Sequence, residues 1–434
     1  MQEHLPSQRA VFSIEKIGLR SIKHKMLNWA TRFGIFLFLD SNGHTAQGGK
    51  YDCLLGAGVR KLFNPAEHSF DELYRFHKDH QQWLFGHLCY DLKNELEPTL
   101  SSGHEQRHGF PLMQFFIPEV IAGIDHNTSE LFIEAEDAEA VYRQIMAMPD
   151  EATYKMPVLT FQQRLHKDRY LHTIGVLREH IRNGDCYEIN YCNEGYCTGA
   201  AIDPVAAFRR LNQLSPAPFA ACYKLEDQYL MCASPERYLY KQGEKVISQP
   251  IKGTTRRGAD DTQDNQLREA LQNSEKERAE NVMIVDLVRN DLARSCKTGS
   301  VTVDELFGIY SFPQVHQMIS TVSGTLKPGI PFTDAIKNSF PMGSMTGAPK
   351  VKVMELIEKY EVARRELFAG SVGYISPGGD FDFNVVIRSL FYNEVSAYLS
   401  YQAGGAITWD SDAVAEWEEM RLKALAMEQL FDGG

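Results

Sequence analysis

Ser248-Gln249-Pro250-Ile251-Lys252-Gly253-Thr254 is the segment from which the fold and chemistry of this chain are best predicted. Residues with high β-propensity precede it, so we expect a strand to end here, with Pro250 and Gly253 stopping the ladder. Burial would disfavour the ammonium form of Lys252 and leave part of the amine free to act as a nucleophile. Because most lysines are solvated charges, the segment alone is also compatible with an ordinary exposed turn.

The composition is typical of a globular protein and argues against several functional classes. The 434 residues are enough for two or three domains or one large core. A net charge of −12 and the lack of a basic run argue against a nucleic-acid partner. The eight cysteines are scattered without zinc-like spacing, which is typical of thiols in a reducing compartment. With no signal-peptide pattern and no apolar run long enough to span a membrane, we expect a cytoplasmic protein without a membrane partner.

The chain divides by pattern into two parts. Residues 1–147 contain short strands at 35–39, 83–91 and 131–135 and a helix at 137–146, without a recognisable catalytic set. A break at 148–151 and the polar residues after it suggest a linker. Residues 160–434 form the second part, with a helix at 168–182 and strands at 187–191 and 229–233. Glu236 lies just past the last of these strands. This is a suitable position for a general acid or base, and it is also a common position for a solvated glutamate.

Paired glutamates occur on two predicted helices. A Ser-x-x-Glu capping box at 274–277 predicts a helix to about residue 288 that presents Glu277 and Glu280 on one face. A C-terminal helix capped at 411 or 412 and running to about 431 presents Glu416 and Glu419 in the same way. Two such pairs can hold Mg²⁺, which prefers oxygen ligands, although acidic pairs are more often solvated helix faces.

Three further features suit the binding of anions. The segment 341–350 places Ser344 and Thr346 among glycines at the start of a helix, where amides and hydroxyls can bind a carboxylate or phosphate. Its spacing is not that of a P-loop. Arg388, in the predicted strand 385–389, needs an anionic partner. Gly404 and Gly405 follow the predicted strand 397–401.

Five motifs of the second part, in their order along the chain, resemble the chorismate-utilising enzymes. They are Pro250-Ile-Lys-Gly-Thr254, Arg278-Ala-Glu-Asn-Val-Met-Ile-Val-Asp-Leu287, Arg289-Asn-Asp291, Gly347-Ala-Pro-Lys350 and Val386-Ile-Arg388. The resemblance covers residues 161–434, and residues 83–91 match the front part of the family more loosely. It implies an α+β fold in which two antiparallel sheets form a sandwich flanked by helices, with the active site between the sheets.

Within this family, a lysine at the position of Lys252 is typical of the branch that aminates chorismate at C4, whereas anthranilate-forming members carry a small residue there. The resemblance implies that Lys252 attacks ring C2 while the C4 hydroxyl, protonated by Glu236, leaves, and that ammonia then enters at C4 and displaces the lysine. It also implies Mg²⁺ ligands at Glu280 and Glu419, with Glu277 and Glu416 in support. The positions that match the substrate-binding site are Arg388, Tyr374, Thr346, Ser344, Gly404, Gly405 and Lys423.

Three positions depart from the family pattern. Gln317 stands where anthranilate-forming members have a histidine, which favours a product that keeps its enolpyruvyl group. Glu188 replaces the glutamine of the amine-forming members and the lysine of those that activate water, so its role stays open. Ala406 replaces a glycine, which affects only the detail of the carboxylate contact.

The sequence therefore predicts an enzyme that combines chorismate with ammonia to give 4-amino-4-deoxychorismate, which leads to para-aminobenzoate and folate. No glutaminase signature of the Gly-x-Cys-x-Gly type occurs, so a separate glutamine amidotransferase subunit is expected to supply the ammonia. Two alternatives remain open: the large component of an anthranilate synthase, and a non-catalytic subunit that binds tryptophan. Mg²⁺-dependent consumption of chorismate would exclude the second.

Overall fold

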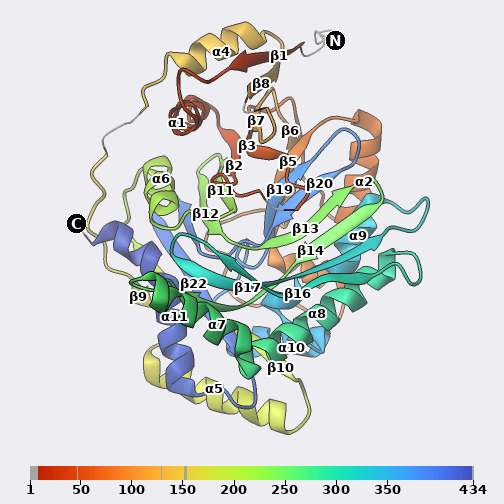
Figure 1. The fold of residues 1–434 in the computed structure, drawn as a ribbon, viewed down its shortest axis with the longest axis vertical. Helices are drawn as coiled ribbons and strands as arrows, with labels where there is room; N and C mark the ends of the chain where they lie inside the picture. Colours follow the sequence, from red (N-terminus) through yellow and green to blue (C-terminus); the bar gives the residue numbers. More distant parts are fainter. Residues whose placement is uncertain (1–7, 46, 129, 151–153, 433–434) are drawn as a thin grey trace.

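Two antiparallel sheets packed face to face form the centre of the protein (Figure 1). The structure is a computed structural model, and it describes residues 8–45, 47–128, 130–150 and 154–432. The expected sandwich of two antiparallel sheets flanked by helices is confirmed. None of the helices in these ranges is both long and apolar enough to cross a membrane.

The larger sheet has 12 strands, all paired antiparallel. In spatial order they are β1 (Gln8–Ser13), β8 (Glu130–Ala135), β7 (Val120–Asp125), β3 (Tyr51–Ala57), β2 (Ile35–Asp40), β11 (Phe219–Leu225), β12 (Gln228–Ser234), β21 (Ser389–Asn393), β22 (Tyr398–Ile407), β10 (Glu188–Thr198) and β18 (Gly347–Ala348), and β9 (Gln162–Gln163) also pairs with β10.

The smaller sheet has 10 strands and is again antiparallel. Its order is β15 (Ile251–Arg256), β17 (Val315–Thr325), β14 (Lys245–Gln249), β13 (Arg237–Gln242), β20 (Phe381–Asn384), β19 (Ser371–Ile375), β5 (Leu84–Leu88), β6 (Met113–Ile117) and β4 (Lys61–Phe63), and β16 (Thr302–Ser311) pairs with β17.

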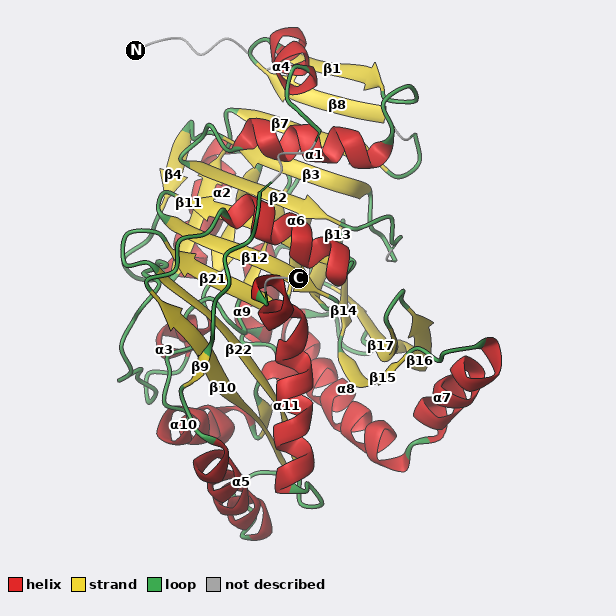
Figure 2. Ribbon diagram, turned by 90° about the vertical axis from the view of Figure 1, so that its left-hand side faces the viewer, coloured by secondary structure: helices red, strands yellow, loops and turns green. Residues whose placement is uncertain are grey.

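Helices flank both sheets (Figure 2). They are α1 (Leu19–Ala30), α2 (Ser69–His80), α3 (Lys93–Leu96), α4 (Ala138–Met146), α5 (Lys167–Arg182), α6 (Pro204–Leu214), α7 (Asp261–Asn273), α8 (Glu275–Ser295), α9 (Phe332–Ser339), α10 (Lys350–Tyr360) and α11 (Ala413–Glu428), with short 3₁₀ turns η1 (Tyr90–Leu92), η2 (Gly343–Met345) and η3 (Gln429–Phe431). The helices predicted at 137–146, 168–182 and 275–288 correspond to α4, α5 and the first part of α8, and the one predicted at the C-terminus corresponds to α11 and η3.

The two faces of the larger sheet contact different hydrophobic cores. Along β2, Leu37 packs into the core between the sheets, while Phe36 and Phe38 pack into a second core with helices such as α1 and α11. This separation follows from the period of two along a strand, which points successive side chains to opposite faces. The larger sheet is therefore the middle layer of the molecule.

Both parts of the chain contribute strands to both sheets. β2 pairs with β11 across the larger sheet, and β5 pairs with β19 across the smaller one. In Figure 1 the red and orange strands accordingly lie beside green and blue ones. The two parts of the chain therefore share each sheet. Their division into residues 1–147 and 160–434 stays a prediction from the sequence.

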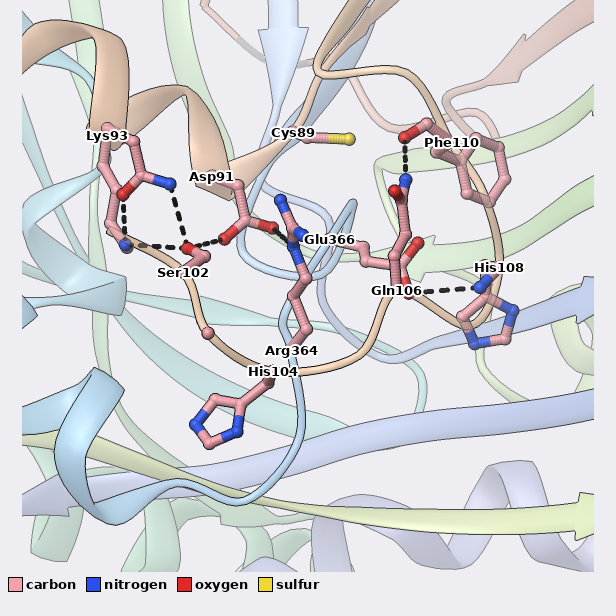
Figure 3. Close-up of polar contacts among 12 residues, drawn as sticks. Cys89, Asp91, Lys93, Ser102, His104, Gln106, His108, Phe110, Arg364 and Glu366 are labelled. Carbon is pink, nitrogen blue, oxygen red and sulfur yellow. Dashed lines mark hydrogen bonds and ion pairs between the residues drawn. The ribbon is translucent and has the colours of Figure 1, made fainter. Parts of the chain in front are cut away.

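A loop at residues 97–112 is fixed by polar contacts with the second part of the chain (Figure 3). Ser102 Oγ donates to Asp91 Oδ1 at 2.6 Å, and Arg364 Nε pairs with Asp91 Oδ2 at 2.9 Å. The carboxylate of Glu366 accepts hydrogen bonds from the backbone amides of residues 107, 108 and 109 at 2.7 to 3.1 Å. These contacts anchor a long irregular loop, whose backbone would otherwise lack partners.

Candidate active site

Lys252 lies at a bulge in β15. Ile251 pairs with Ile319 of β17, and the next paired residue is Thr254, opposite Gln317, so Lys252 and Gly253 are left out of the register. The predicted strand end is confirmed, because β14 stops at Gln249, just before Pro250. The breaking role predicted for Gly253 was wrong, because β15 pairs with β17 again from Thr254 on. Gly253 has a φ of +90°, and a Cβ there would lie 2.9 Å from Glu277 Oε2. The bulge needs glycine and holds β15 close to α8.

Lys252 is paired with Glu188. Lys252 Nζ donates to Glu188 Oε1 at 2.6 Å, and the two residues are 8% and 1% exposed. Burial lowers the pKa of Lys252, but the carboxylates of Glu188 and Glu280 raise it by more, so the pKa lies above its usual value. The direction of this shift is opposite to the fall in pKa that burial alone would cause. Glu188 Oε2 is buried and accepts no hydrogen bond from any described residue.

Glu236 lies between β12 and β13 and is 4% exposed. Ser344 Oγ donates to Glu236 Oε1 at 2.6 Å. Burial raises the pKa of Glu236 to about 7, although the hydrogen bond from Ser344 and the charge of Lys252 oppose the shift. A carboxyl group that is partly protonated near neutral pH suits general acid catalysis. The structure therefore brings Lys252, Glu236 and Ser344 together.

The turn that carries Ser344 and Thr346 is buried, whereas the sequence suggested exposed amides. Thr346 Oγ1 donates to the Met342 carbonyl at 3.0 Å. Asn190 Nδ2 donates to the Ser344 carbonyl at 3.1 Å, and Arg365 Nη1 donates to the Met345 carbonyl at 2.7 Å. Asn190 and Arg365 thus fix this turn against β10, two residues from Glu188. Neither contact has a local signal in the sequence, because each joins distant segments.

The four predicted metal-binding glutamates lie on α8 and α11, and Lys276 of α8 approaches a carboxylate of each helix. Burial raises the pKa of Glu280 to about 7, and burial also raises the pKa values of Glu277 and Glu416. Burial acts on Glu419 too, but Lys423 Nζ, 2.6 Å from Glu419 Oε1, brings the pKa of that carboxyl below its usual value. The metal-binding role of these four glutamates stays a prediction.

The donor set of this cluster fits Mg²⁺. Glu280 Oε1 is buried and accepts no hydrogen bond within the described part of the chain, as expected for an oxygen that awaits a cation. As the side chains of the described residues stand, no group of three or more histidine, cysteine or acidic residues is arranged so that it could hold a metal ion. Instead, the ammonium of Lys276 lies 3.8 Å from Glu280 Oε1 and 3.7 Å from Glu416 Oε1. No role was predicted for Lys276 from the sequence.

Gly404 and Gly405 lie within β22 and not after the strand, which is longer than predicted. A Cβ on Gly405 would lie 3.0 Å from Glu416 Oε2 and 3.5 Å from Glu419 Oε1, so this glycine borders the acidic cluster. Lys423 Nζ donates to the Gly404 carbonyl at 2.8 Å while it pairs with Glu419. The structure brings both glycines and Lys423 to the cluster.

Arg388 lies between β20 and β21, with a φ of +53°, and not inside a strand as predicted. Its Nη1 donates to the Lys423 carbonyl at 3.4 Å, and no ion pair with a carboxylate is seen among the described residues. Burial lowers the pKa of Arg388 to about 10, and the charge of Glu419 opposes this shift. A partly buried guanidinium without a carboxylate partner is suited to receive an anionic ligand.

Tyr374 is not part of this group of residues. It lies on β19, where its ring packs 5.6 Å from that of Trp83 and 6.1 Å from that of Tyr51. Together with Arg237 and Asp382, it lines a separate cavity between the front part of the chain and the smaller sheet. The substrate-binding position predicted for Tyr374 therefore does not agree with its place in the structure, because the pairing of β19 with β5 directs the ring into this other cavity.

The sequence matches the family of chorismate binding enzymes over residues 43–429. It is 36% identical over 313 residues to aminodeoxychorismate synthase component 1 from Klebsiella aerogenes, covering 70% of this chain and 68% of that protein. It is 39% identical over 259 residues to aminodeoxychorismate synthase component 1 from Escherichia coli K12, covering 60% and 56% of the two chains.

Solved structures of similar fold include anthranilate synthase component I from Streptococcus pneumoniae, with a TM-score of 0.75, 24% identity and coverage of 99% of this chain and 94% of that one. The menaquinone-specific isochorismate synthase from Escherichia coli has a TM-score of 0.76 and 17% identity, covering 99% and 96%. At these identities the likeness concerns the fold alone, and it agrees with the two-sheet architecture described above.

Proposed function

The chain belongs to the family of chorismate binding enzymes and is an enzyme that acts on chorismate, and we propose that it aminates chorismate at C4 to give 4-amino-4-deoxychorismate. The names of its relatives support this reaction. The observation that carries the proposal is the buried Lys252 beside Glu236, a nucleophile next to a carboxyl group whose pKa is about 7. The product would be the precursor of para-aminobenzoate in folate synthesis.

In the proposed mechanism, Lys252 first passes a proton to Glu188, whose Oε1 accepts the hydrogen bond from Lys252 Nζ. Its amine then attacks ring C2, the ring double bonds shift, and the C4–O bond breaks while Glu236 donates a proton, so that the hydroxyl leaves as water. Ammonia next attacks C4, the double bonds shift back, and the bond between C2 and Lys252 breaks with its electron pair returning to the lysine nitrogen. The leaving group and the entering ammonia thus never need to occupy C4 together.

Carboxylate binding is assigned to residues around the acidic cluster. Glu280 and Glu419 would hold Mg²⁺ with support from Glu277 and Glu416, and bound Mg²⁺ would offset the charge of the substrate's C1 carboxylate. The groups proposed to hold the substrate's carboxylates are Arg388, Lys423, Ser344, Thr346 and the backbone at Gly404 and Gly405. Tyr374 is left out because it lines the other cavity.

A separate glutamine amidotransferase subunit is proposed as the source of ammonia. The designation component 1 of the relatives implies a second component. If the partner only supplies ammonia, then ammonium salts at sufficient concentration will replace it in the assay.

Product identity tests the proposal. The purified chain is incubated with chorismate, Mg²⁺ and ammonium, and the mixture is separated before and after an aminodeoxychorismate lyase is added. We expect para-aminobenzoate only after the lyase. Fluorescent anthranilate formed without the lyase would instead identify an anthranilate synthase, and a lack of Mg²⁺-dependent chorismate consumption would identify a binding subunit.

The nucleophile is tested by Lys252→Ala with Lys241→Ala as the matched control. Both lysines are 8% exposed and both belong to the smaller sheet, but Lys241 pairs with Asp380 at 3.0 Å, away from Glu188. Amination should be lost in Lys252→Ala and kept in Lys241→Ala. Turnover of Lys252→Ala at the native rate would rule out its nucleophilic role.

A further inference from the structure

Lys276 occupies the mouth of the acidic cluster as a cation that belongs to the chain itself. Its ammonium lies within 4 Å of carboxylates on both helices, Glu280 of α8 and Glu416 of α11, at 3.8 and 3.7 Å. Both distances are longer than a hydrogen bond, so the contact is mainly electrostatic. Its side chain is 50% exposed, whereas those of Glu280 and Glu416 are 9% and 3% exposed. A half-exposed cation thus lies beside two buried carboxylates.

The need for such a cation follows from the charges of the site. Four glutamates converge here, and the ammonium groups of Lys252, Lys276 and Lys423 oppose their charges. Lys423 already pairs with Glu419 at 2.6 Å and with the Gly404 carbonyl. Lys276 offsets part of the charge of Glu280 and Glu416, the two carboxylates within 4 Å of its ammonium, because like charges held close together in a poorly solvated site repel one another.

Two cations cannot share this position. Mg²⁺ bound by the acidic cluster would bring its charge to within a few ångströms of the Lys276 ammonium, and the repulsion would be strong. A half-exposed lysine can turn its ammonium into solvent while its stem stays on the helix. Movement of Lys276 is thus the least costly way to admit the metal.

We propose that Lys276 is a positioning residue that serves as an internal counter-ion for the metal-binding carboxylates and has to swing away before Mg²⁺ binds. The inference rests on the metal site of the proposed function. Lys276 then holds the cluster together in the absence of metal and lowers the affinity of the free enzyme for Mg²⁺.

The first test is calorimetric titration of Mg²⁺ into the native chain, Lys276→Met and Lys276→Arg, without chorismate. We expect Lys276→Met to bind Mg²⁺ about fivefold more tightly, the factor that corresponds to one partly solvated ion pair. Lys276→Arg keeps the charge and should bind like the native chain. Tighter binding is a result that mere damage to the structure would not produce.

Lys167→Met is the matched control. Lys167 is 45% exposed and pairs with Glu418 of the same helix α11, at 3.0 Å, but joins it to α5 and not to the acidic cluster. Its Mg²⁺ affinity should equal that of the native chain. Equal or weaker Mg²⁺ binding by Lys276→Met would overturn the proposal.

Thermal unfolding supplies a second readout that needs no turnover. In EDTA, Lys276→Met should unfold at a lower temperature than Lys167→Met, and saturating Mg²⁺ should remove the difference. A difference that persists with Mg²⁺ would mean a structural role only and would overturn the proposal. If neither the native chain nor any variant binds Mg²⁺, the metal site of the proposed function is wrong and this inference is wrong with it. If the native chain and Lys276→Met bind Mg²⁺ with equal, measurable affinity, only this inference is overturned.

Discussion

Lys252 Nζ donates a hydrogen bond to Glu188 Oε1 at 2.6 Å, and this contact joins the two sheets of the sandwich, since Lys252 is on β15 and Glu188 on β10. The other carboxylates that raise the pKa of Lys252 are those of Glu280 on α8 and of Glu236 before β13. With all of these facing it, the lysine holds its proton in the resting protein. Deprotonation must therefore accompany substrate or metal binding.

Replacing Glu188 with Gln should make Lys252 a better nucleophile in the resting protein. The carboxylate raises the pKa of Lys252, so its removal lowers that pKa and increases the fraction of free amine at neutral pH. We expect Lys252 to be acetylated faster by acetic anhydride in Glu188→Gln, measured by mass spectrometry of the Lys252 peptide over a pH series.

Glu194→Gln controls for the loss of a buried carboxylate on the same strand. Glu194 is 3% exposed and pairs with Arg164 at 2.8 Å, near the opposite end of β10. Acetylation of Lys252 should be unchanged in this variant. Equal acetylation in the native chain and Glu188→Gln would show that Glu188 does not set the proton affinity of Lys252.

Activity should fall as the pH rises through about 7, because Glu236 must be protonated to act as the acid and burial raises its pKa to about 7. Ser344→Ala removes a hydrogen bond that lowers this pKa, so the alkaline decline of kcat/KM should move to higher pH. Ser102→Ala, which removes a hydrogen bond of the same 2.6 Å length to Asp91, should leave the profile in place. A decline at the same pH in Ser344→Ala would argue against Glu236 as the acid.

The helices that carry the acidic cluster could be predicted from the sequence because their signals are local. Ser274 accepts a hydrogen bond from the Glu277 amide at 3.3 Å, and Asp412 caps α11 in the same way. Glutamates three residues apart then share a face whatever the rest of the fold does. Capping and helical spacing therefore placed Glu277, Glu280, Glu416 and Glu419 without knowledge of the strand order.

Contacts across the sheets could not be predicted, because they depend on register and on pairing between distant segments. The bulge at Lys252 shifts the register within β15, and the partner of that lysine is 64 residues away along the chain. Tyr374 shows the same limit, since its position follows from the pairing of β19 with β5. A motif gives the residue type at such positions but not the cavity into which the side chain points.

The two neighbouring glycines of β22 should respond differently to substitution with alanine. A Cβ at Gly404 would lie 2.1 Å from the Tyr191 carbonyl, a backbone atom of β10 that cannot move away, so Gly404→Ala should lower the unfolding temperature. A Cβ at Gly405 would instead lie 3.0 Å from Glu416 Oε2, so Gly405→Ala should fold but bind Mg²⁺ on the order of tenfold more weakly. Calorimetry and thermal unfolding of both variants test this contrast, and unchanged Mg²⁺ affinity in Gly405→Ala would remove that glycine from the metal site.

Lys23 should make a large contribution to stability far from the acidic cluster. Its Nζ lies 2.7 Å from Asp40 Oδ1 and 2.7 Å from Asp52 Oδ2, and all three residues are buried where α1 crosses β2 and β3. Burial lowers the pKa of Lys23, but the two carboxylates raise it above its usual value. Because the folded-state pKa is the higher one, the stabilisation is fully present below the pKa of the unfolded chain, about 10.4, and is lost only as the pH rises through the folded-state value.

Lys23→Met leaves two buried carboxylates without a cation, so the free energy of unfolding at pH 7 should fall by about 3–5 kcal/mol. Lys167→Met, a surface pair, should lose no more than about 1 kcal/mol. Lowering the pH protonates the carboxylates left unpaired in Lys23→Met, so the gap between the native chain and this variant should narrow in acid. Urea unfolding at pH 7 and pH 4.5 measures both effects, and a gap that is absent at pH 7 would show that the two aspartates do not need Lys23.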